Sequence, residues 1–222
     1  MDWPALRLSA ELGLFTVLLL LPLGIFLGRW LATWHSRARS VIEALLALPL
    51  VLPPTVVGYY LLVALGGGSV IGRAYQQVFG HALVFTFEGL LLASAIVNIP
   101  FAIQPMQRAF EAIPPAVREA AACAGMPPWK VLLKIDLPLA WPGILSGMVL
   151  TFAHTLGEFG VVLMVGGSIP GQTRTISIAI YDRVQAFDNA AAGAMAATLL
   201  ALSVVALAVT YRLGGRPGRM HG

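Results

Sequence analysis

Apolar residues in this chain gather into five long runs, and most of the charged residues lie in the shorter stretches between them. A helix needs about 20 apolar residues to cross the hydrocarbon core of a bilayer, which is roughly 30 Å thick. Each run is long enough to meet this requirement. The pattern therefore predicts five transmembrane helices, at about residues 9–28, 41–64, 83–107, 139–165 and 190–212.

The second run is interrupted by prolines. Pro49, Pro53 and Pro54 all fall within the short stretch 48–58. A proline removes a backbone hydrogen-bond donor and clashes with the preceding helical turn, so we expect the helix over 41–64 to bend or break here. Two interpretations stay open: an ordinary kink packed against neighbouring helices, and a moving element of a transport pathway.

Polar side chains in the third run form a small set. Glu88 lies near one end of this run, and Asn98 and Gln104 lie toward the other. Polar groups in membrane helices rarely face lipid. Hydrogen bonding to neighbouring helices is the favoured explanation for these residues, ahead of contact with a substrate.

The fourth run carries a second polar set toward its end, made of Thr151, His154, Thr155 and Glu158. Their spacing of i, i+3, i+4 and i+7 places all four on one face of a helix. We call this set the polar stripe. It is expected to point toward a partner or a water-filled space rather than lipid, and packing against another helix is the alternative.

Composition agrees with a membrane protein. Of the 222 residues, 58% are hydrophobic and 11% are charged, which is more apolar surface than a soluble domain of this size could bury. No internal repeat or second domain is visible. We therefore predict a single all-α membrane domain over 1–222, with its core at about 9–213.

The basic residues favour one orientation of the predicted helices. Ten of the fourteen lysines and arginines fall on one side of the predicted topology, and the other four fall on the opposite side. Because the basic side of a membrane protein faces the cytosol, the N-terminus is expected outside and the C-terminus in the cytosol. This bias accounts for the net charge of +4, so no nucleic-acid partner is expected.

Signatures of chemistry are missing from the sequence. There is no phosphate-binding G-x-x-x-x-G-K-[ST] loop, the four histidines are scattered, and no Cys/His cluster suggests a metal site. No serine or cysteine has a recognisable activating neighbour. We therefore expect neither an enzyme nor a cofactor or metal, and energy for any uphill transport must come from another chain.

The longest segment that carries several charges and is also predicted to be helical lies between the third and fourth runs. It covers residues 115–138, and we call it the elbow. Alanine is the best helix former, and Pro115 suits a first helical turn. Gly125 stands where a helix ends in a left-handed residue, and Pro127 and Pro128 can start a second short helix. The elbow is therefore predicted to be a helix–glycine–helix unit.

The elbow also carries a motif with specific spacing: Glu119-Ala120-Ala121, three residues, Gly125, nine residues, and then Ile135-x-Leu137-Pro138. This motif resembles the cytosolic signature of permeases of type I ABC importers. Stretches 48–59, 156–160 and 169–177 look like the molybdate branch of that family, and sulfate and tungstate permeases are related alternatives. A simple connecting loop would need neither two helices nor a buried alanine face.

The resemblance implies an assembly. Two copies of the chain would form the pathway in the bacterial cytoplasmic (inner) membrane, in contact with lipid, and five helices are few for one chain to enclose a path. Two ATPase subunits would dock on the cytosolic side, and a substrate-binding protein would dock outside. Coupling to the ATPase is then expected at six elbow residues: Glu119, Ala120, Ala121, Gly125, Leu137 and Pro138.

For the pathway, we expect Thr151, His154, Thr155, Glu158 and Arg174 to contribute. An unpaired Glu158 would repel an anion, so it is expected to pair with His154 or Arg174 and to serve an outer gate. A self-sufficient channel or secondary transporter is the competing class. It would call for inverted repeats or a row of charges inside the membrane, and the sequence shows neither.

Overall fold

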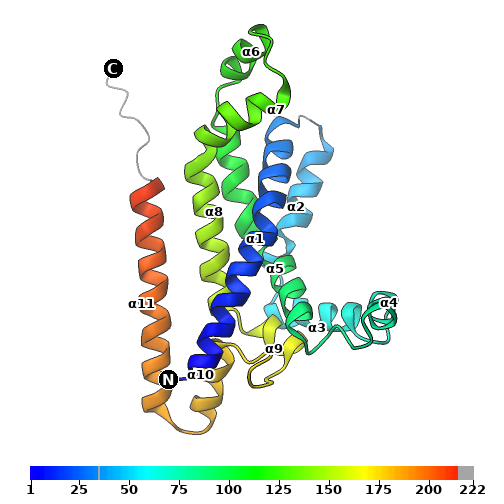
Figure 1. The fold of residues 1–222 in the computed structure, drawn as a ribbon, viewed down its shortest axis with the longest axis vertical. Helices are drawn as coiled ribbons and strands as arrows, with labels where there is room; N and C mark the ends of the chain where they lie inside the picture. The colour runs from blue at the N-terminus through cyan, green and yellow to red at the C-terminus, as the bar shows by residue number, and fades with distance from the viewer. Residues whose placement is uncertain (35, 215–222) are drawn as a thin grey trace.

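The computed structural model describes residues 1–34 and 36–214, and every regular element in these ranges is a helix. Four long helices run along the long axis of the molecule (Figure 1): α1 (Trp3–Thr33), α5 (Phe87–Glu111), α8 (Leu137–Gly157) and α11 (Asn189–Gly214). α1, α5 and α8 pack against one another, and α11 packs on α8 and on α10 (Ile176–Gln185). Each of the four is long and apolar enough to cross a membrane, which confirms the prediction of an all-α membrane protein.

The second predicted span, 41–64, is broken. α2 (Ala38–Val51) and α3 (Pro54–Leu65) meet at an angle of 107°, and α3 runs across the bundle rather than along it (Figure 1). Leu52 has an extended backbone (φ −74°, ψ 140°), as expected of a residue that precedes a proline. The proline-rich stretch therefore breaks the helix, as the sequence predicts.

The fourth predicted span, 139–165, ends earlier than expected. α8 stops at Gly157, Glu158 is extended (φ −66°, ψ 129°), and the short α9 (Gly160–Gly166) follows. The hydroxyl of Ser177 donates to the carbonyl oxygens of Leu156 and Glu158 at 3.1 and 3.0 Å. These contacts from α10 satisfy backbone groups at the helix end, so the helix can stop inside an apolar run.

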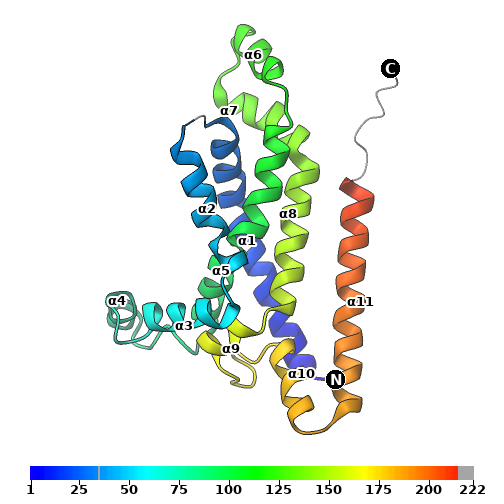
Figure 2. The same cartoon turned by 180° about the vertical axis from the view of Figure 1, so that it is seen from behind.

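The two ends of the bundle have different structures (Figures 1 and 2). At the elbow end, α6 (Pro115–Cys123) and α7 (Pro128–Val131) project beyond the long helices. The π-helical turn η1 (Leu132–Asp136) joins α7 to α8. At the opposite end lie α3, α4 (Val70–Phe79), α9 and α10.

Glycines let the three central helices approach closely. A Cβ on Gly147 of α8 would lie 2.8 Å from the carbonyl oxygen of Ala102 on α5, and one on Gly28 of α1 would lie 3.0 Å from the backbone nitrogen of Gln107. Between α1 and α5, Thr16 donates a buried hydrogen bond to Ser94 at 3.1 Å. Small residues and buried hydroxyl bonds are the usual means by which membrane helices associate.

The outer surface of the bundle is apolar. No residue of α2 is buried, and only 11% of the most apolar stretch of α11 is buried inside the chain. Large side chains such as Phe26 and Val51 are exposed. Lipid or another protein chain must cover such a surface in the working molecule.

Candidate functional site

The elbow has the predicted local structure. Pro115 opens α6, and Gly125 ends it with a left-handed backbone (φ 72°). The N–H of Gly125 donates to Ala122 at 2.9 Å and that of Met126 to Ala121 at 3.0 Å, the paired bonds of a Schellman cap. Pro128 then opens α7.

The elbow helix is largely exposed, which corrects one expectation. Of the alanines in α6, only Ala121 is buried, so most of the alanine face points away from the rest of the chain. Glu119 is exposed, and no ion pair joins it to the described residues. Trp129, at the start of α7, is 60% exposed. Small and apolar side chains that project from the end of a bundle are suited to contact with another protein.

The six predicted coupling residues do not form one surface. Glu119, Ala120 and Gly125 are exposed on the elbow, whereas Ala121 is buried. Leu137 and Pro138 begin α8, where they line an apolar groove of about 330 Å³ together with Leu21 and Ile25 of α1. The second half of the motif, Leu137-Pro138, therefore belongs to the first turn of the spanning helix α8.

One buried carboxylate connects the elbow to the bundle. Asp136 has no exposed side-chain area and accepts hydrogen bonds from two arginines. Arg29 of α1 donates to it at 2.7 Å, and Arg118 of α6 donates at 2.9 Å. Arg118 also donates to the carbonyl oxygen of Phe110, near the end of α5, at 3.1 Å. We call Asp136, Arg29 and Arg118 the Asp136 triad.

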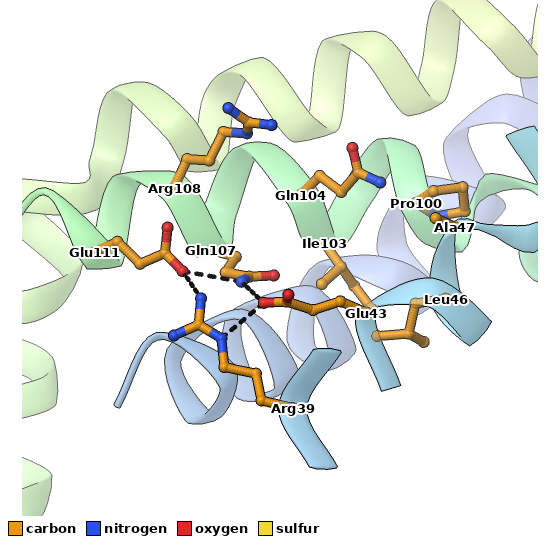
Figure 3. A pocket seen from close by; sticks show the side chains of 10 residues that line it. All are labelled: Arg39, Glu43, Leu46, Ala47, Pro100, Ile103, Gln104, Gln107, Arg108 and Glu111. Carbon is orange, nitrogen blue, oxygen red and sulfur yellow. Dashed lines mark hydrogen bonds and ion pairs between the residues drawn. The ribbon is translucent and has the colours of Figure 1, made fainter. Parts of the chain in front are cut away.

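A pocket of about 440 Å³ opens between α2 and α5 at the elbow end (Figure 3). Arg39 of α2 donates to Glu43 at 2.7 Å and also pairs with Glu111 of α5. Gln107 donates to the same two carboxylates, at 2.6 Å to Glu43 and 2.9 Å to Glu111. We call this set the Arg39 network.

Polar residues of α5 are used in two ways. Asn98 is buried and bonds to Ser94 on its own helix and to His154 on α8, so hydrogen bonding between helices is confirmed for this residue. Gln104 instead lines the pocket beside Arg108. Figure 3 shows both side chains lying apart from the Arg39 network.

The polar stripe divides in the structure. Thr151 and Thr155 are each about 1% exposed, and Thr155 donates to the carbonyl oxygen of Thr151 at 2.8 Å. Packing inside the chain, the alternative interpretation of the stripe, therefore describes these two threonines. His154 is 31% exposed, with its ring stacked on Phe101 at 4.0 Å and its Nδ1 3.1 Å from Asn98.

Glu158 meets one of its two expected partners. Its Oε2 lies 3.7 Å from Nε2 of His154, and its Oε1 accepts from the N–H of Val161 at 3.1 Å. The side chain thus caps the start of α9 while it reaches back to α8. Arg174 is engaged elsewhere, with Asp182 at 3.1 Å and Asp2 at 3.8 Å.

Comparison with known proteins places the chain in a family. Residues 21–217 match the family described as binding-protein-dependent transport system inner membrane component. The molybdenum transport system permease protein ModB of Azotobacter vinelandii is 45% identical over 95% of this chain and 93% of its own length. ModB of Escherichia coli K12 is 39% identical over 83% of this chain and 80% of its own. The sulfate transport system permease protein CysT of E. coli K12 is 33% identical over 88% and 72%.

A solved structure agrees at the level of the fold. The crystal structure of a bacterial alginate ABC transporter, in complex with an alginate pentasaccharide-bound periplasmic protein, matches with a TM-score of 0.70. Its sequence identity is 19%, and the match covers 95% of this chain and 76% of that one. The chain is a permease of the ABC importer class. It belongs to the binding-protein-dependent transport system inner membrane components, and it is a multi-pass protein of the bacterial inner membrane rather than an enzyme.

Sequence reasoning missed the Asp136 triad and the Arg39 network. A usable signal was present, because Arg29, Arg118 and Asp136 are charged residues next to apolar runs. Such charges need partners when they become buried. The sequence alone does not say which residues pair, since the partners come from distant segments.

Proposed function

We propose that this chain is the molybdate-conducting membrane subunit of an ATP-driven importer. The observation that carries the proposal is the 45% identity to ModB of A. vinelandii over 95% of the chain. The 33% identity to a sulfate permease favours sulfate as the second candidate substrate, and tungstate resembles molybdate in charge and shape. The elbow end faces the cytosol in this proposal, because the basic residues of the described helix ends are concentrated there.

Coupling to a separate ATPase subunit takes place at the elbow. Exposed Glu119 and Ala120 on α6, and Trp129 at the start of α7, supply a charged and an apolar contact beyond the end of the bundle. A helix that begins at a proline and ends in a glycine cap has well-defined ends, so a bound partner can displace it as a rigid body. This supports the view that the elbow is a docking element rather than a connecting loop.

Two copies of the chain enclose the pathway. The unburied α2 and the partly exposed His154 support this arrangement, because a second copy would cover them. His154 and Glu158 lie where α8 breaks, and we assign them to the outer gate. A path for a dianion has to bind weakly, so hydroxyl and amide groups suit it better than a strong fixed site.

Uptake into proteoliposomes tests this function. The chain, its ATPase and a substrate-binding protein should import molybdate only when ATP is supplied to the ATPase side, and excess tungstate should compete more strongly than sulfate. Stronger competition by sulfate than by tungstate would indicate sulfate as the substrate in place of molybdate. Uptake by the chain alone, without the ATPase, would favour the self-sufficient channel instead.

The orientation has its own test. A reporter fused within 118–134 should read as cytosolic, and one within 168–175 should read as external. An external reading from the elbow would overturn the coupling role together with the topology.

A further inference from the structure

Asp136 lies where four helical segments converge at the elbow end. Its carboxylate joins Arg29 of α1 to Arg118 of α6, and Arg118 is also bonded to the carbonyl oxygen of Phe110 near the end of α5. Asp136 itself is the last residue of η1, the turn that leads into α8. A single buried side chain thus connects the elbow to α1 and to the start of α8, and Arg118 adds a separate bond to α5.

The elbow has few other attachments to the bundle. Ala121 is the one residue of α6 that is buried, so apolar packing contributes little to holding this helix. Among the described residues, the ion pair of Arg118 with Asp136 is the one that links α6 to the rest of the chain. Hydrogen bonds between ionised groups are short and directional, so this contact fixes the angle of α6 as well as its position.

The π-helical turn has a consequence for Asp136. A π turn contains one residue more than an α turn and rotates the side chains that follow by about 100°. η1 covers Leu132–Asp136, and Asp136 is its last and fully buried residue. Single π turns often occur at functional sites. The irregular turn and the buried charge coincide at the junction between the elbow and α8.

We propose that Asp136 is a positioning residue for energy coupling. Through Arg118 and Arg29 it holds α6 at a fixed angle to α1 and α8, so a displacement of the elbow by the ATPase moves both spanning helices. Without it, the same displacement is absorbed by bending of the short connections on either side of α6. This inference rests on the proposed function of the elbow as the coupling element.

The first test measures ATP hydrolysed per molybdate imported by the full complex in proteoliposomes. Asp136→Asn keeps the shape of the side chain and removes its charge, and Arg118→Gln removes one donor. Both should raise the ATP used per molybdate at least about fivefold, the lower end of typical coupling effects. Arg39→Gln is the matched control, because it removes an arginine charge at the same end without touching α6, and its ratio should equal that of the native chain.

The second test does not depend on transport. Cys123 is the single cysteine of the chain and lies exposed on α6, so a nitroxide spin label attached there reports the motion of the elbow. In the full-length chain in nanodiscs, Asp136→Asn and Arg118→Gln should give a more mobile spectrum than the native chain, and Arg39→Gln should not. If the native complex moves none of the tested oxyanions, the proposed function fails, whereas the spin label still decides whether Asp136 holds α6.

A native spectrum together with a native ATP ratio in both triad variants would overturn the proposal. Lower abundance in the membrane, with a native ratio in the molecules that do assemble, would also overturn it and leave a purely structural role. If Asp136→Asn does not reach the membrane, Arg118→Gln and Arg29→Gln decide by the same criteria. The Arg29→Gln/Arg118→Gln double variant should lose less coupling than the product of the single losses, because both arginines act through one carboxylate.

Discussion

The Asp136 triad and the Arg39 network place the same ionic groups in different surroundings at one end of the molecule. The carboxylate of the triad is fully buried, whereas the side chains of Arg39, Glu43 and Glu111 are between 26% and 36% exposed. A buried carboxylate is costly to leave unpaired, because it cannot be solvated, whereas a carboxylate that is about one-third exposed is screened by water. The triad can therefore act as a fixed joint, and the network is a weaker contact at the edge of a pocket.

The largest effect is expected when the buried carboxylate is lost altogether. Asp136→Leu leaves Arg29 and Arg118, whose side chains are 29% and 21% exposed, without their shared acceptor and should cost about 1–3 kcal/mol of stability, the usual penalty for donors left unpaired. Thermal denaturation of the purified chain measures the loss. Glu43→Leu makes the same chemical change in the Arg39 network and should cost no more than about 1 kcal/mol. Equal losses in the two variants would show that burial does not separate the clusters.

A second variant tests the elbow beyond the triad. Gly125→Val should leave the protein inserted but raise ATP consumption without transport, because a β-branched residue in a left-handed conformation carries about 1–2 kcal/mol of strain. Apart from its chain neighbours, no heavy atom of the described residues lies within 4 Å of the position that a Cβ would occupy on Gly125, so the strain comes from the backbone alone. Gly125→Asn tolerates this conformation and should keep transport linked to hydrolysis. If Gly125→Val and Gly125→Asn consume the same amount of ATP per molybdate imported, the glycine has no conformational role.

Charge reversal on the elbow should affect the partner and not the fold. Glu119→Lys places a cation on an exposed position and should weaken binding of the ATPase subunit by about tenfold or more, since like or misplaced charges at an interface cost several kcal/mol. The melting temperature of the isolated chain should stay unchanged. Thermophoresis with labelled ATPase measures the binding, and Glu119→Gln should give an intermediate value. If Glu119→Lys binds the ATPase subunit with native affinity, the ATPase does not dock on this face of α6.

The smallest effect is expected from Arg39→Gln. Its partners Glu43 and Glu111 are 36% and 34% exposed, so the melting temperature should fall by no more than about 2–4 °C. The remaining difference should shrink as salt is raised, because salt screens exposed charges. Melting curves at low and high salt check both points. A large loss that salt does not reduce would mean that the Arg39 network is as important to the fold as the triad.

Features fixed by neighbouring residues were predictable from the sequence. The break between α2 and α3 follows from consecutive prolines, and the left-handed end of α6 follows from Gly125. The contact between His154 and Glu158 follows from their i, i+4 spacing. The end of α8 could not be predicted from the sequence, because it depends on hydrogen bonds from Ser177, which lies about twenty positions further along the chain.

Contacts between distant segments set the limit of sequence reasoning. Arg29 and Asp136 are 107 positions apart, and nothing in the local pattern pairs them. The spacing of the polar stripe indicates a single helix face but not what covers it, and the structure shows that Thr151 and Thr155 are buried. Arg174 was a reasonable partner for Glu158 by charge, but Asp2 and Asp182 lie closer to it in the fold.

The break between α2 and α3 leaves the backbone hydrogen bonds on either side of it in place. The N–H of Leu52 is bonded back to Leu48 in α2, and the carbonyl of Pro53 accepts from Val56 and Val57 in α3. Pro53 and Pro54 have no N–H, so they add no unpaired donor at the break. α3 packs on α9, with Gly58 against Met164 and Gly160 against Pro54. α9 is in turn buried against α5 through Val161 and Val165, so the broken span is held across the bundle by contacts on its far side.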